Sequence, residues 1–554
     1  MHAERLSDRI RRNDWYRHTV QQMFARTCDD RGDFPALYFD GRFTSFRELH
    51  EQVDALTAGL VEQGIGAGDV VSVLPSPTPE FVVVYFAVLQ TGATFNALNL
   101  LWGTTEFAGV IKRNAPKMII SVDEHNGRDY ARVLREATGG WDVDQGRVRC
   151  AAVPSLERLV CVARKGPIPD GFTDIAQLSG PIAAEDRARI RARVEASQVT
   201  DVQFICQTSG STGLSKSALW NHRSPLATAN YTARYLGLDG TDRYINLSPF
   251  FHNSGICASM TMCLAYAGIT LYLTERFVPA EALELVAAQQ ITATFGFDAH
   301  WQGLRRDPSF SRDKFTISKA LIAGEPKTYE LCRSMCPADS VIANLYAQTE
   351  NGPMVAMNDF GCVDERINKF TNGRPLPGVE VVIKEIETGR RLPQGEAGEI
   401  CYKSPFLFVG YLQQDDEYQR VMDDEGYLHS GDFGMFDGGY ITFLGRLGGV
   451  VKSGGENVST LRVSALLLDV FADEFDDVQT IGVEDDYWGS KVVTFVRPKP
   501  GVAIGTRTEL RARCKGAMAD YEIPQEFLPW EGDWPASPEG KLDVRLLRSR
   551  VSRS

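Results

Sequence analysis

The amino-acid sequence predicts an α/β fold with parallel sheets covered by helices, followed by a smaller unit of different character. Three observations lead to this prediction. Apolar segments with helical spacing alternate with short strand-like runs, and glycine turns separate the two. After Pro375 the pattern changes to short strands between glycines, which indicates a small β-rich subdomain over about 376–445. Five glycines then lie between Gly445 and Gly455, where we expect an interdomain hinge.

Length and composition are typical of a multidomain globular protein. At about 150 residues per domain, the 554 residues allow about three or four domains. Hydrophobic residues make up 43% of the chain and charged residues 24%, which excludes disordered, collagen-like and membrane-embedded proteins. We expect a large N-terminal domain over 1–446 and a small C-terminal domain over 447–554, with the boundary near Arg446.

The charge balance argues against nucleic acid and anionic lipid as partners. The formal net charge is −13, and no local basic patch interrupts it. Residues 1–12 lack the apolar core of a secretory signal, so the cytoplasm is the expected location. The longest strongly apolar stretch, from Phe81 to Leu89, is far shorter than the roughly 20 residues that cross a bilayer. We therefore predict a buried helix there and no membrane span.

The alternation of helices and strands begins early in the chain. Phenylalanine, leucine and valine recur at helical spacing over 44–64, and a glycine-rich turn then leads into a buried strand over 69–74. Strands that alternate with helices in this way form parallel sheets. The same order predicts helices at 80–90 and 105–114 and strands at 91–98 and 117–122.

Two later regions depart from this alternation. Between 139 and 196 the pattern weakens, and we interpret the segment as a surface excursion with a strand near 159–163 and a polar helix at 185–195. In the β-rich subdomain, strands are expected at 379–384, 398–402 and 440–444.

The cysteines do not indicate a disulfide framework or a structural zinc site. There are eleven, an odd number, and they are scattered along the chain without a C-x-x-C pair. This usage is typical of reduced thiols in a protein core.

A loop rich in glycine and hydroxyl groups follows the strand-like run from Asp201. Such a loop offers backbone N–H groups, hydroxyls and an ammonium group to a polyphosphate. It differs from the G-x-x-x-x-G-K-[ST] pattern of P-loop nucleotidases, because Ser215 stands where that pattern needs glycine. The candidate phosphate-binding residues are Thr208, Ser209, Gly210, Ser211, Thr212, Gly213 and Lys216.

This loop resembles the T-S-G-[ST]-T-G-x-P-K loop of the adenylate-forming superfamily of acyl- and aryl-CoA synthetases, adenylation domains and beetle luciferases. It matches from Thr208 to Lys216 except at Ser215, where the family has proline. Further motifs of the family follow in order over roughly 35–548. The resemblance implies two parallel-type αβ subdomains and a small β-barrel subdomain, then a small, mobile α+β C-terminal domain. It also implies ATP and Mg²⁺ as cofactors.

The segment Asn344–Glu350 is similar to the family's N-x-Y-G-x-T-E motif, with Ala347 in place of glycine. The resemblance implies that Tyr346 stacks on adenine, that Asn344 meets the amino edge of adenine and that Thr349 touches the α-phosphate. Glu350 would help to hold magnesium. An aromatic face suits a purine, and a carboxylate beside phosphates is stable when a divalent cation bridges the like charges.

Two shorter motifs match the family's ribose-binding residues. Ser430-Gly431-Asp432 resembles [TS]-G-D, and Gly445-Arg446 resembles the G-R that follows it. The resemblance implies that Asp432 accepts hydrogen bonds from both ribose hydroxyls and that Arg446 also contacts the ribose region; a carboxylate is a natural bidentate acceptor for a cis-diol.

Other motifs imply catalytic and substrate-binding residues. His252 lies in a segment similar to the one whose histidine gates the acyl pocket, and Lys541 matches the adenylation lysine of the P-x-x-x-x-G-K loop. Lys541 would neutralise charge at the α-phosphate as pyrophosphate leaves. Lys452 matches the lysine that serves the second half-reaction in luciferase-like members. The loop beside adenine and the acyl group corresponds to Gly324, Glu325 and Pro326.

The resemblance weakens at the hinge. Many acyl-CoA synthetases read G-R-x-[DK]-[DE] there, but this chain has Gly448 and Gly449 at the two charged positions. Farther on, Thr460-Leu-Arg-Val-Ser464 replaces the family's proline-x-glutamate-x-glutamate. The sequence leaves open whether the conformation for thioester formation is kept.

The first functional hypothesis is an ATP-dependent ligase that adenylates a small aryl or short acyl acid and transfers it to CoA. The second is adenylation followed by capture with a non-thiol acceptor such as an amine, or activation of nitrite to diazotise an arylamine. A non-catalytic nucleotide-binding scaffold is the third. The acid would bind near 250–257, 295–301 and 323–329, where Phe297, His300 and Trp301 mix aromatic and polar character.

Overall fold

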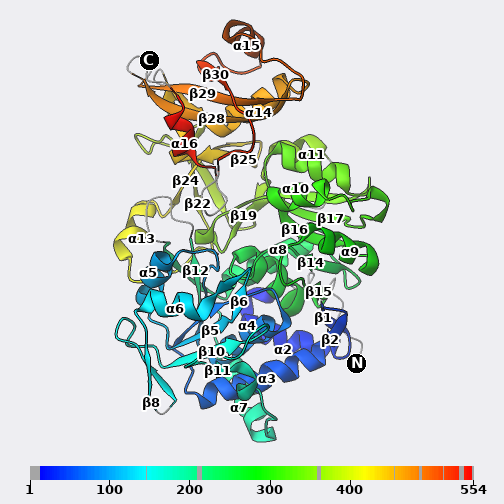
Figure 1. Ribbon diagram of the computed structural model, residues 1–554, viewed down its shortest axis with the longest axis vertical. Coiled ribbons are helices and arrows are strands. Elements are labelled where there is room, and N and C mark those ends of the chain that lie inside the picture. Colours follow the sequence, from blue (N-terminus) through cyan, green and yellow to red (C-terminus); the bar gives the residue numbers. More distant parts are fainter. Residues whose placement is uncertain are drawn as a thin grey trace. The chain divides into compact units, whose positions relative to one another are not determined.

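The computed structural model describes residues 13–144, 146–208, 215–358, 364–453, 456–485, 489–515, 517–535 and 542–551. The chain forms two compact units. The first unit comprises Met1–Lys369, Leu376–Gly378 and Ser404–Arg420, and the second comprises Phe370–Pro375, Val379–Lys403 and Val421–Ser554. Figure 1 shows the course of the chain through both units.

The first unit contains two large sheets in which most neighbouring strands are parallel, as predicted. The first sheet has the order β11 (Thr173–Asp174), β10 (Arg158–Val162), β5 (Met118–Val122), β3 (Val70–Leu74), β4 (Thr94–Ala97), β12 (Val202–Gln207), β13 (Ser217–Asn221), β23 (Gly410–Tyr411). The second has the order β2 (Arg42–Ser45), β1 (Pro35–Phe39), β15 (Thr270–Tyr272), β14 (Arg243–Asn246), β16 (Ala293–Phe297), β17 (Lys319–Ala323), β18 (Val341–Ala347), β19 (Met354–Met357).

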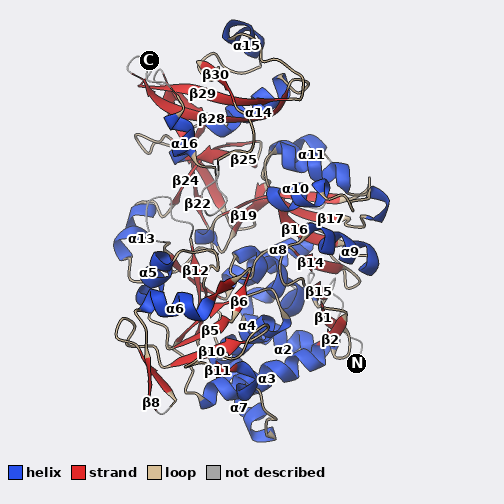
Figure 2. Cartoon of the chain, in the orientation of Figure 1, coloured by secondary structure: helices blue, strands red, loops and turns tan. Residues whose placement is uncertain are grey.

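Helices flank these sheets, drawn in blue beside the red strands in Figure 2. Their bounds are α2 (Val20–Arg31), α3 (Phe46–Glu62), α4 (Pro79–Thr91), α5 (Thr104–Asn114), α6 (Tyr130–Thr138), α7 (Ala184–Ala196), α8 (Arg223–Tyr235), α9 (Pro279–Gln289), α10 (Asp298–Arg306), α11 (Pro326–Met335), α12 (Glu365–Phe370), α13 (Asp415–Val421). The π-helix η3 (Ser254–Ala267) is buried along its whole length. Short 3-10 turns are η1 (Trp15–Arg17), η2 (Ile175–Leu178), η4 (Arg312–Lys314), η5 (Thr349–Asn351). Two small hairpins are β6 (Glu124–His125) with β7 (Arg128–Asp129) and β8 (Asp142–Asp144) with β9 (Arg147–Arg149).

Local sequence explains where these helices begin and end. Ser45 caps α3 and forms a capping box with Glu48, since each side chain accepts a hydrogen bond from the other residue's backbone N–H. Helix α4 begins at Pro79 and ends at Thr91, and Gly92, its C-cap residue, has a φ of 84°. All its residues from Phe81 onward are buried, which confirms the buried helix predicted there.

One regional prediction is wrong in part. The stretch 139–196 was expected to be a surface excursion, but β10 inside it pairs with β5 and is a member of the first sheet. Leu159, Val160, Cys161 and Val162 are all buried. The strand itself was predicted near 159–163, but its place in the first sheet depends on its pairing with β5, which the local sequence does not show.

The second unit is built mainly from antiparallel sheets. One contains β21 (Glu380–Lys384), β22 (Ala397–Lys403), β24 (Leu428–Asp437), β25 (Tyr440–Arg446), and near it in sequence are β20 (Arg374–Pro375) and η6 (Leu447–Gly449). A hairpin of β26 (Val450–Ser453) and β27 (Glu456–Ser459) follows. The remaining elements are α14 (Thr460–Val470), β28 (Phe475–Asp485), β29 (Gly489–Pro498), α15 (Arg507–Cys514), β30 (Glu526–Pro529), α16 (Val544–Ser549). The second unit contains the β-rich segment as well as the C-terminal segment, so its limits do not correspond to a boundary near Arg446. The domain boundary near Arg446 therefore stays a prediction.

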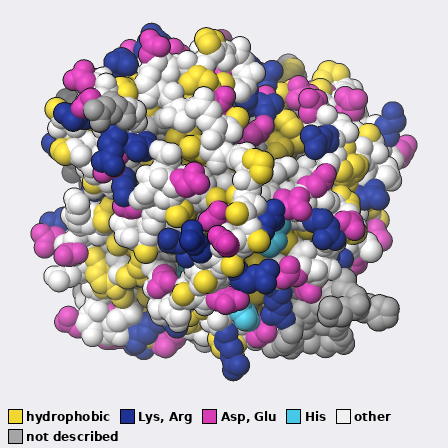
Figure 3. Space-filling view, turned by 90° about the horizontal axis from the view of Figure 1, so that it is seen from below, with side chains coloured by type: hydrophobic (Ala, Val, Ile, Leu, Met, Phe, Trp, Pro, Cys, Tyr) yellow, Lys and Arg dark blue, Asp and Glu magenta, His cyan; other side chains and the backbone are white. Residues whose placement is uncertain are grey.

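Surface and core both have the character of a globular protein. In the part of the face that Figure 3 draws in colour, basic and acidic side chains lie interspersed. Every cysteine among the described residues is buried. None of the helices in the described ranges has the length and apolar character needed to cross a bilayer.

A buried histidine in the first unit predicts acid sensitivity. His222 is fully buried, its Nδ1 accepts a hydrogen bond from the backbone N–H of Val20 at 3.3 Å, and burial lowers its pKa to about 3. Below pH about 6.5 the unfolded chain protonates this ring, whereas the folded chain does not, so stability falls as the pH falls. We expect a loss of about 3 kcal/mol at pH 4 from this residue. Urea unfolding between pH 7 and 4 should be less pH-dependent for His222→Asn, and an unchanged dependence would contradict the assignment.

Candidate functional site

The two described ends of the candidate phosphate-binding loop are joined to each other in the first unit. Thr208 follows β12 and Lys216 precedes β13, and the Thr208 N–H donates to the Lys216 carbonyl at 2.9 Å. The Lys216 N–H donates to Thr208 Oγ1 at 3.3 Å. These two hydrogen bonds therefore hold the two ends of the loop together. The other candidate phosphate ligands, Ser209, Gly210, Ser211, Thr212 and Gly213, lie outside the described residues.

Tyr411 connects the phosphate loop to Glu350. The Lys216 ammonium lies 5.0 Å from the centre of the Tyr411 ring, and the Tyr411 hydroxyl donates to Glu350 Oε1 at 2.6 Å. Burial, and then the charge of Glu350, raise the pKa of Tyr411, so its hydroxyl stays protonated and donates. Lys216 also forms an ion pair with Glu417 of α13 at 2.7 Å, and this contact lowers the pKa of Glu417.

Thr349 and Glu350 lie in η5, directly after β18. The Thr349 carbonyl accepts a hydrogen bond from Trp220 Nε1 at 2.9 Å, and its Oγ1 accepts one from Asn253 Nδ2 at 3.2 Å. The Glu350 carbonyl accepts from the Phe408 N–H at 2.9 Å. Segments from both large sheets thus fix η5 in place.

Asn344 joins β18 to the loop that follows β17. Its Oδ1 accepts from the N–H groups of Gly324 and Leu345, and its Nδ2 donates to the Gly324 carbonyl at 2.9 Å. Asn344 therefore positions Gly324, and its predicted contact with adenine stays a prediction. Tyr346 is buried two residues later on the same strand. Glu325 is the N-cap residue of α11, and Pro326 is its first residue.

His252 lies in the loop between β14 and η3. A Cβ on Gly255 would lie 2.4 Å from the Pro249 carbonyl oxygen, so glycine is required where η3 packs against this loop. The His252 Nδ1 accepts from the Ser254 N–H at 3.1 Å, which assigns the ring proton to Nε2. The residue as a whole retains exposed surface, but the protein around the imidazole desolvates the ring and lowers its pKa to about 4.

Phe297 contacts two imidazole rings at the end of β16. Its ring centre lies 5.2 Å from that of His252 and 5.8 Å from that of His300. Desolvation, and then the proximity of His252, lower the pKa of His300 to about 4. Trp301 was expected in the same pocket, but it is fully buried in a hydrophobic core and its Nε1 donates to the Gly296 carbonyl. The indole is therefore a core residue, and this part of the prediction is wrong.

The carboxyl ends of β14, β16, β17 and β18 place these segments along one edge of the second sheet, because the four strands are parallel neighbours. Phe297 is the last residue of β16, and the segments that follow the other three strands contain His252, Gly324 and Thr349. Ligands of open α/β sheets bind at this edge.

In the second unit, Asp432 and Arg446 lie opposite each other on β24 and β25. The Arg446 Nε is 3.0 Å from Asp432 Oδ1; the Asp432 side chain is buried and that of Arg446 is exposed. The pairing of β24 with β22 shifts register just before Asp432, and Gly431 has a φ of 69° in this bulge. Bulges of this kind redirect a side chain beside a binding site.

Glu399 and His429 hold this bulge. One Glu399 oxygen accepts from the Gly431 N–H at 2.9 Å, and the other lies 2.7 Å from His429 Nδ1. The hydrogen bond to Glu399 raises the pKa of His429. Cys401 lies beside the same imidazole, so the three residues could surround a metal ion, but both carboxylate oxygens are already engaged.

The remaining predicted residues belong to the second unit. Lys452 lies on β26, and its side chain is not among those described. Lys541 lies outside the described residues. The unusual residues of the segment 460–464 have structural partners: Thr460 Oγ1 donates to the Gly449 carbonyl, Arg462 Nε to Glu522 and Ser464 Oγ to Thr480.

The model of the AMP-binding enzyme family matches residues 24–412, which include the phosphate loop and η5. The chain belongs to this family. The match confirms the predicted resemblance and shows that this AMP-binding enzyme is an ATP-dependent, AMP-forming ligase similar to acyl-CoA synthetases.

Relatives of this AMP-binding enzyme are similar over nearly its whole length. The human mitochondrial medium-chain acyl-CoA ligase ACSF2 is 25% identical over 543 residues, covering 96% of this chain and 86% of the relative. The amide bond synthetase McbA from Marinactinospora thermotolerans has a TM-score of 0.78 at 23% identity, covering 96% of this chain and 100% of that one. The anthranilate CoA ligase AuaEII in complex with anthranoyl-AMP has a TM-score of 0.78 at 19% identity, covering 96% and 97%. The α/β fold prediction is confirmed.

Glu350 of the AMP-binding enzyme fits the magnesium that its family uses. Tyr411 occupies Oε1, and among the described residues no partner takes Oε2, so a hard carboxylate oxygen is available for the cation.

Sequence reasoning missed several residues of this AMP-binding enzyme that touch the predicted site. Tyr411 contacts Glu350 and Glu417 contacts Lys216, but Tyr411 and Glu417 belong to none of the predicted motifs. Only the conformation of the chain brings them together.

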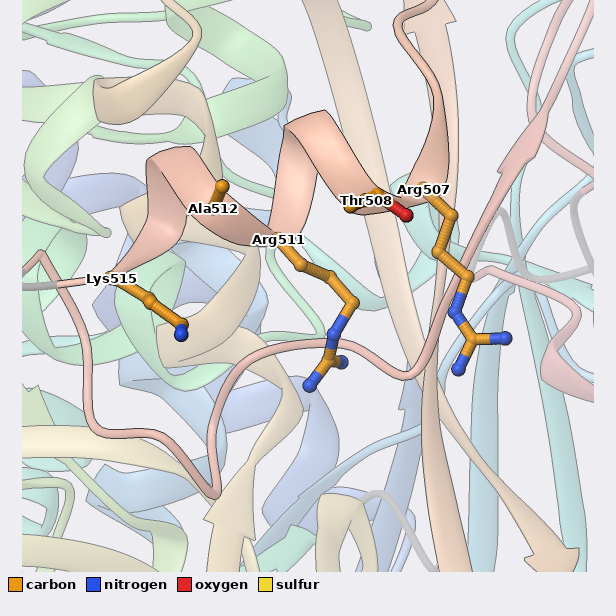
Figure 4. Close-up of a pocket in the computed structure, with 5 residues that line it drawn as sticks. All are labelled: Arg507, Thr508, Arg511, Ala512 and Lys515. Atoms are coloured by element: carbon orange, nitrogen blue, oxygen red, sulfur yellow. The ribbon is translucent and has the colours of Figure 1, made fainter.

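A surface depression of the AMP-binding enzyme lies apart in sequence from every predicted motif. Arg507, Thr508, Arg511, Ala512 and Lys515 line it, and Figure 4 shows the three basic side chains extending to the same side of α15. Arg511 donates to the Ile523 carbonyl at 3.2 Å, so this guanidinium is part of the fold.

Proposed function

We propose that this AMP-binding enzyme activates a small aryl or short acyl carboxylic acid as its acyl-adenylate and transfers the acyl group to the thiol of CoA. The supporting observation is the contact chain from Lys216 through Tyr411 to Glu350. It places a cation of the candidate phosphate loop over the ring of one tyrosine and a candidate magnesium ligand at the hydroxyl of the same residue.

In the first step a carboxylate oxygen of the acid attacks the α-phosphorus of ATP, and the bond to the β-phosphate oxygen breaks as pyrophosphate leaves. Bound Mg²⁺ would neutralise phosphate charge beside Glu350. Lys216 and Lys541 supply positive charge to the leaving group and the α-phosphate, and Thr349 steadies the reacting centre. In the second step the thiol attacks the acyl carbon, and AMP leaves.

The substrate class is supported by Phe297 and the two imidazoles beside it. Both histidines are neutral above about pH 5, because desolvation lowers each pKa to about 4. An aromatic ring between neutral polar groups suits an uncharged aryl or short acyl group. The anthranilate CoA ligase AuaEII is a structural neighbour that binds an aryl adenylate.

A second candidate is adenylation with a non-thiol acceptor. The acceptor would be an amine that attacks the acyl-adenylate, or nitrite would be the activated anion and would diazotise an arylamine. The glycines at 448 and 449, where many acyl-CoA synthetases have charged hinge residues, are compatible with this alternative as well as with CoA transfer. The structural similarity to the amide bond synthetase McbA supports the alternative.

Exchange of labelled pyrophosphate into ATP tests the first step. We expect exchange only when a suitable acid is added, and a panel of aryl acids, short acyl acids and nitrite identifies the substrate. Adding CoA or an amine to the reactive mixture tests the second step. Loss of free thiol in proportion to AMP release supports CoA as the acceptor, whereas an unchanged thiol content with AMP release contradicts it.

A further inference from the structure

Ser215 is hydrogen-bonded in a way that the family's proline cannot reproduce. Its N–H donates to Glu106 Oε1 at 2.8 Å, and its hydroxyl donates to the same oxygen at 2.6 Å. Proline has neither an N–H nor a hydroxyl group. The departure from the family motif therefore coincides with two donors to one carboxylate oxygen.

A second residue of α5 holds the same serine from its other side. Arg113 donates to the Ser215 carbonyl, and its Nη2 donates to Ser217 Oγ at 2.9 Å. Glu106 lies in the first turn of α5 and Arg113 near its end. The N–H, hydroxyl and carbonyl of Ser215 are thus all bound by side chains of one helix.

The same cluster reaches the other arm of the loop. Ser217 Oγ lies 2.7 Å from Asn114 Oδ1 and 3.1 Å from Oε1 of Gln207, the residue before Thr208. Gln207 Nε2 in turn donates to Asn96 Oδ1 at 2.9 Å. Both ends of the loop are therefore tied to α5 or to the neighbouring strand β4.

These bonds are sheltered from solvent. Ser215 is 5% exposed, and Ser217 is fully buried. Hydrogen bonds to a charged partner are stronger than those between neutral groups, and an unpaired buried donor is costly. These hydrogen-bonded residues take no part in the chemical steps described above, so any effect on those steps acts through the position of the loop.

We propose that Glu106, assisted by Arg113, is a positioning residue for ATP: it fixes the backbone at Ser215 so that the adjacent Lys216 meets the triphosphate. This inference rests on the proposed function. Lys216 pairs with Glu417 in this structure, and its ammonium has three N–H donors, so it can turn toward a phosphate that binds beside Glu417 or in its place. A backbone held by Glu106 lets the side chain move while its point of attachment stays in place, which lowers the entropic cost of binding.

A graded series at Ser215 tests the proposal. Ser215→Thr keeps both donors, Ser215→Ala keeps the N–H alone, and Ser215→Pro keeps neither. We expect KM for ATP to rise less than about 3-fold in Ser215→Thr, about 10-fold in Ser215→Ala and about 100-fold in Ser215→Pro. KM for the acid should change less than about 3-fold in all three variants. A purely structural role would raise both KM values together and lower the melting temperature.

The carboxylate supplies the second arm of the test. Glu106→Ala should raise KM for ATP about 10-fold or more in the wild-type background but less than about 2-fold in the Ser215→Pro background, because the partner is already absent. Glu136→Ala, an exposed glutamate on the neighbouring α6, is the matched control and should leave both KM values unchanged. Additive effects of the two substitutions would overturn the proposal, as would an unchanged KM for ATP in Ser215→Pro.

Failure of the proposed function can be distinguished from failure of the positioning role of Glu106. If the wild-type enzyme catalyses no acid-dependent exchange, the same variants are compared for equilibrium binding of ATP with Mg²⁺. Weaker binding in the order Thr, Ala, Pro then supports the positioning role alone, and equal binding refutes it.

Discussion

Replacing Lys541 with alanine is expected to slow acid-dependent pyrophosphate exchange by about 100- to 1,000-fold. Lys541 matches the adenylation lysine of the family, and its ammonium would neutralise the charge that develops at the α-phosphate as pyrophosphate leaves. Such a contact is stronger in the transition state than in the ground state, so kcat falls while KM for ATP changes less than about 3-fold. Initial rates of exchange over a range of ATP concentrations separate the two parameters.

Lys515→Ala is the control for this experiment, because Lys515 is an exposed lysine on the same unit and should give wild-type exchange. Lys452→Ala separates the two half-reactions: it should keep exchange and slow the transfer to the acceptor. Exchange that survives in Lys541→Ala would remove this lysine from its assigned role.

The large features of the fold could be predicted because the pattern of apolar residues can be recognised within a single helix or strand. Helix α3 shows helical spacing of its apolar residues, and α4 and β3 are short apolar runs next to glycine turns; all three lie where they were expected. Strand β10 was assigned to a surface excursion because its membership in the sheet depends on pairing with β5, a tertiary contact. Trp301 was misassigned for a similar reason, since a buried core aromatic and a pocket aromatic look alike in a sequence.

The candidate site could be predicted only as far as its motifs extend. Thr208, Lys216 and Glu350 belong to short conspicuous patterns, but Tyr411 and Glu417 do not, although both contact that set. Ser215 was recognised as a departure, yet its meaning depends on Glu106, whose position next to the loop is set by how α5 packs. Partners of this kind need a structure.

Asp432→Asn is expected to raise KM for ATP about 100-fold. The Asp432 side chain is buried, paired with Arg446 and presented by the bulge that Glu399 and His429 hold, so its carboxylate is fixed before any nucleotide arrives. Two charge-assisted hydrogen bonds to a ribose diol contribute about 3 kcal/mol or more, and the neutral amide replaces one acceptor with a donor. KM for the acid should stay within about 3-fold of wild type, since the substitution acts on the nucleotide.

Asp437→Asn makes the same change at an exposed position at the end of the same strand, β24, and should leave both KM values unchanged. A deoxyribose substrate sharpens the test. Wild-type enzyme should discriminate ATP from 2′-deoxy-ATP by about 10-fold, one hydrogen bond to a charged group, and Asp432→Asn should lose most of that discrimination. A general loss of nucleotide affinity weakens the binding of ATP and 2′-deoxy-ATP alike, whereas loss of a contact to the 2′-hydroxyl weakens the binding of ATP alone. Equal discrimination in the two proteins would therefore show that Asp432 does not contact the 2′-hydroxyl of the ribose.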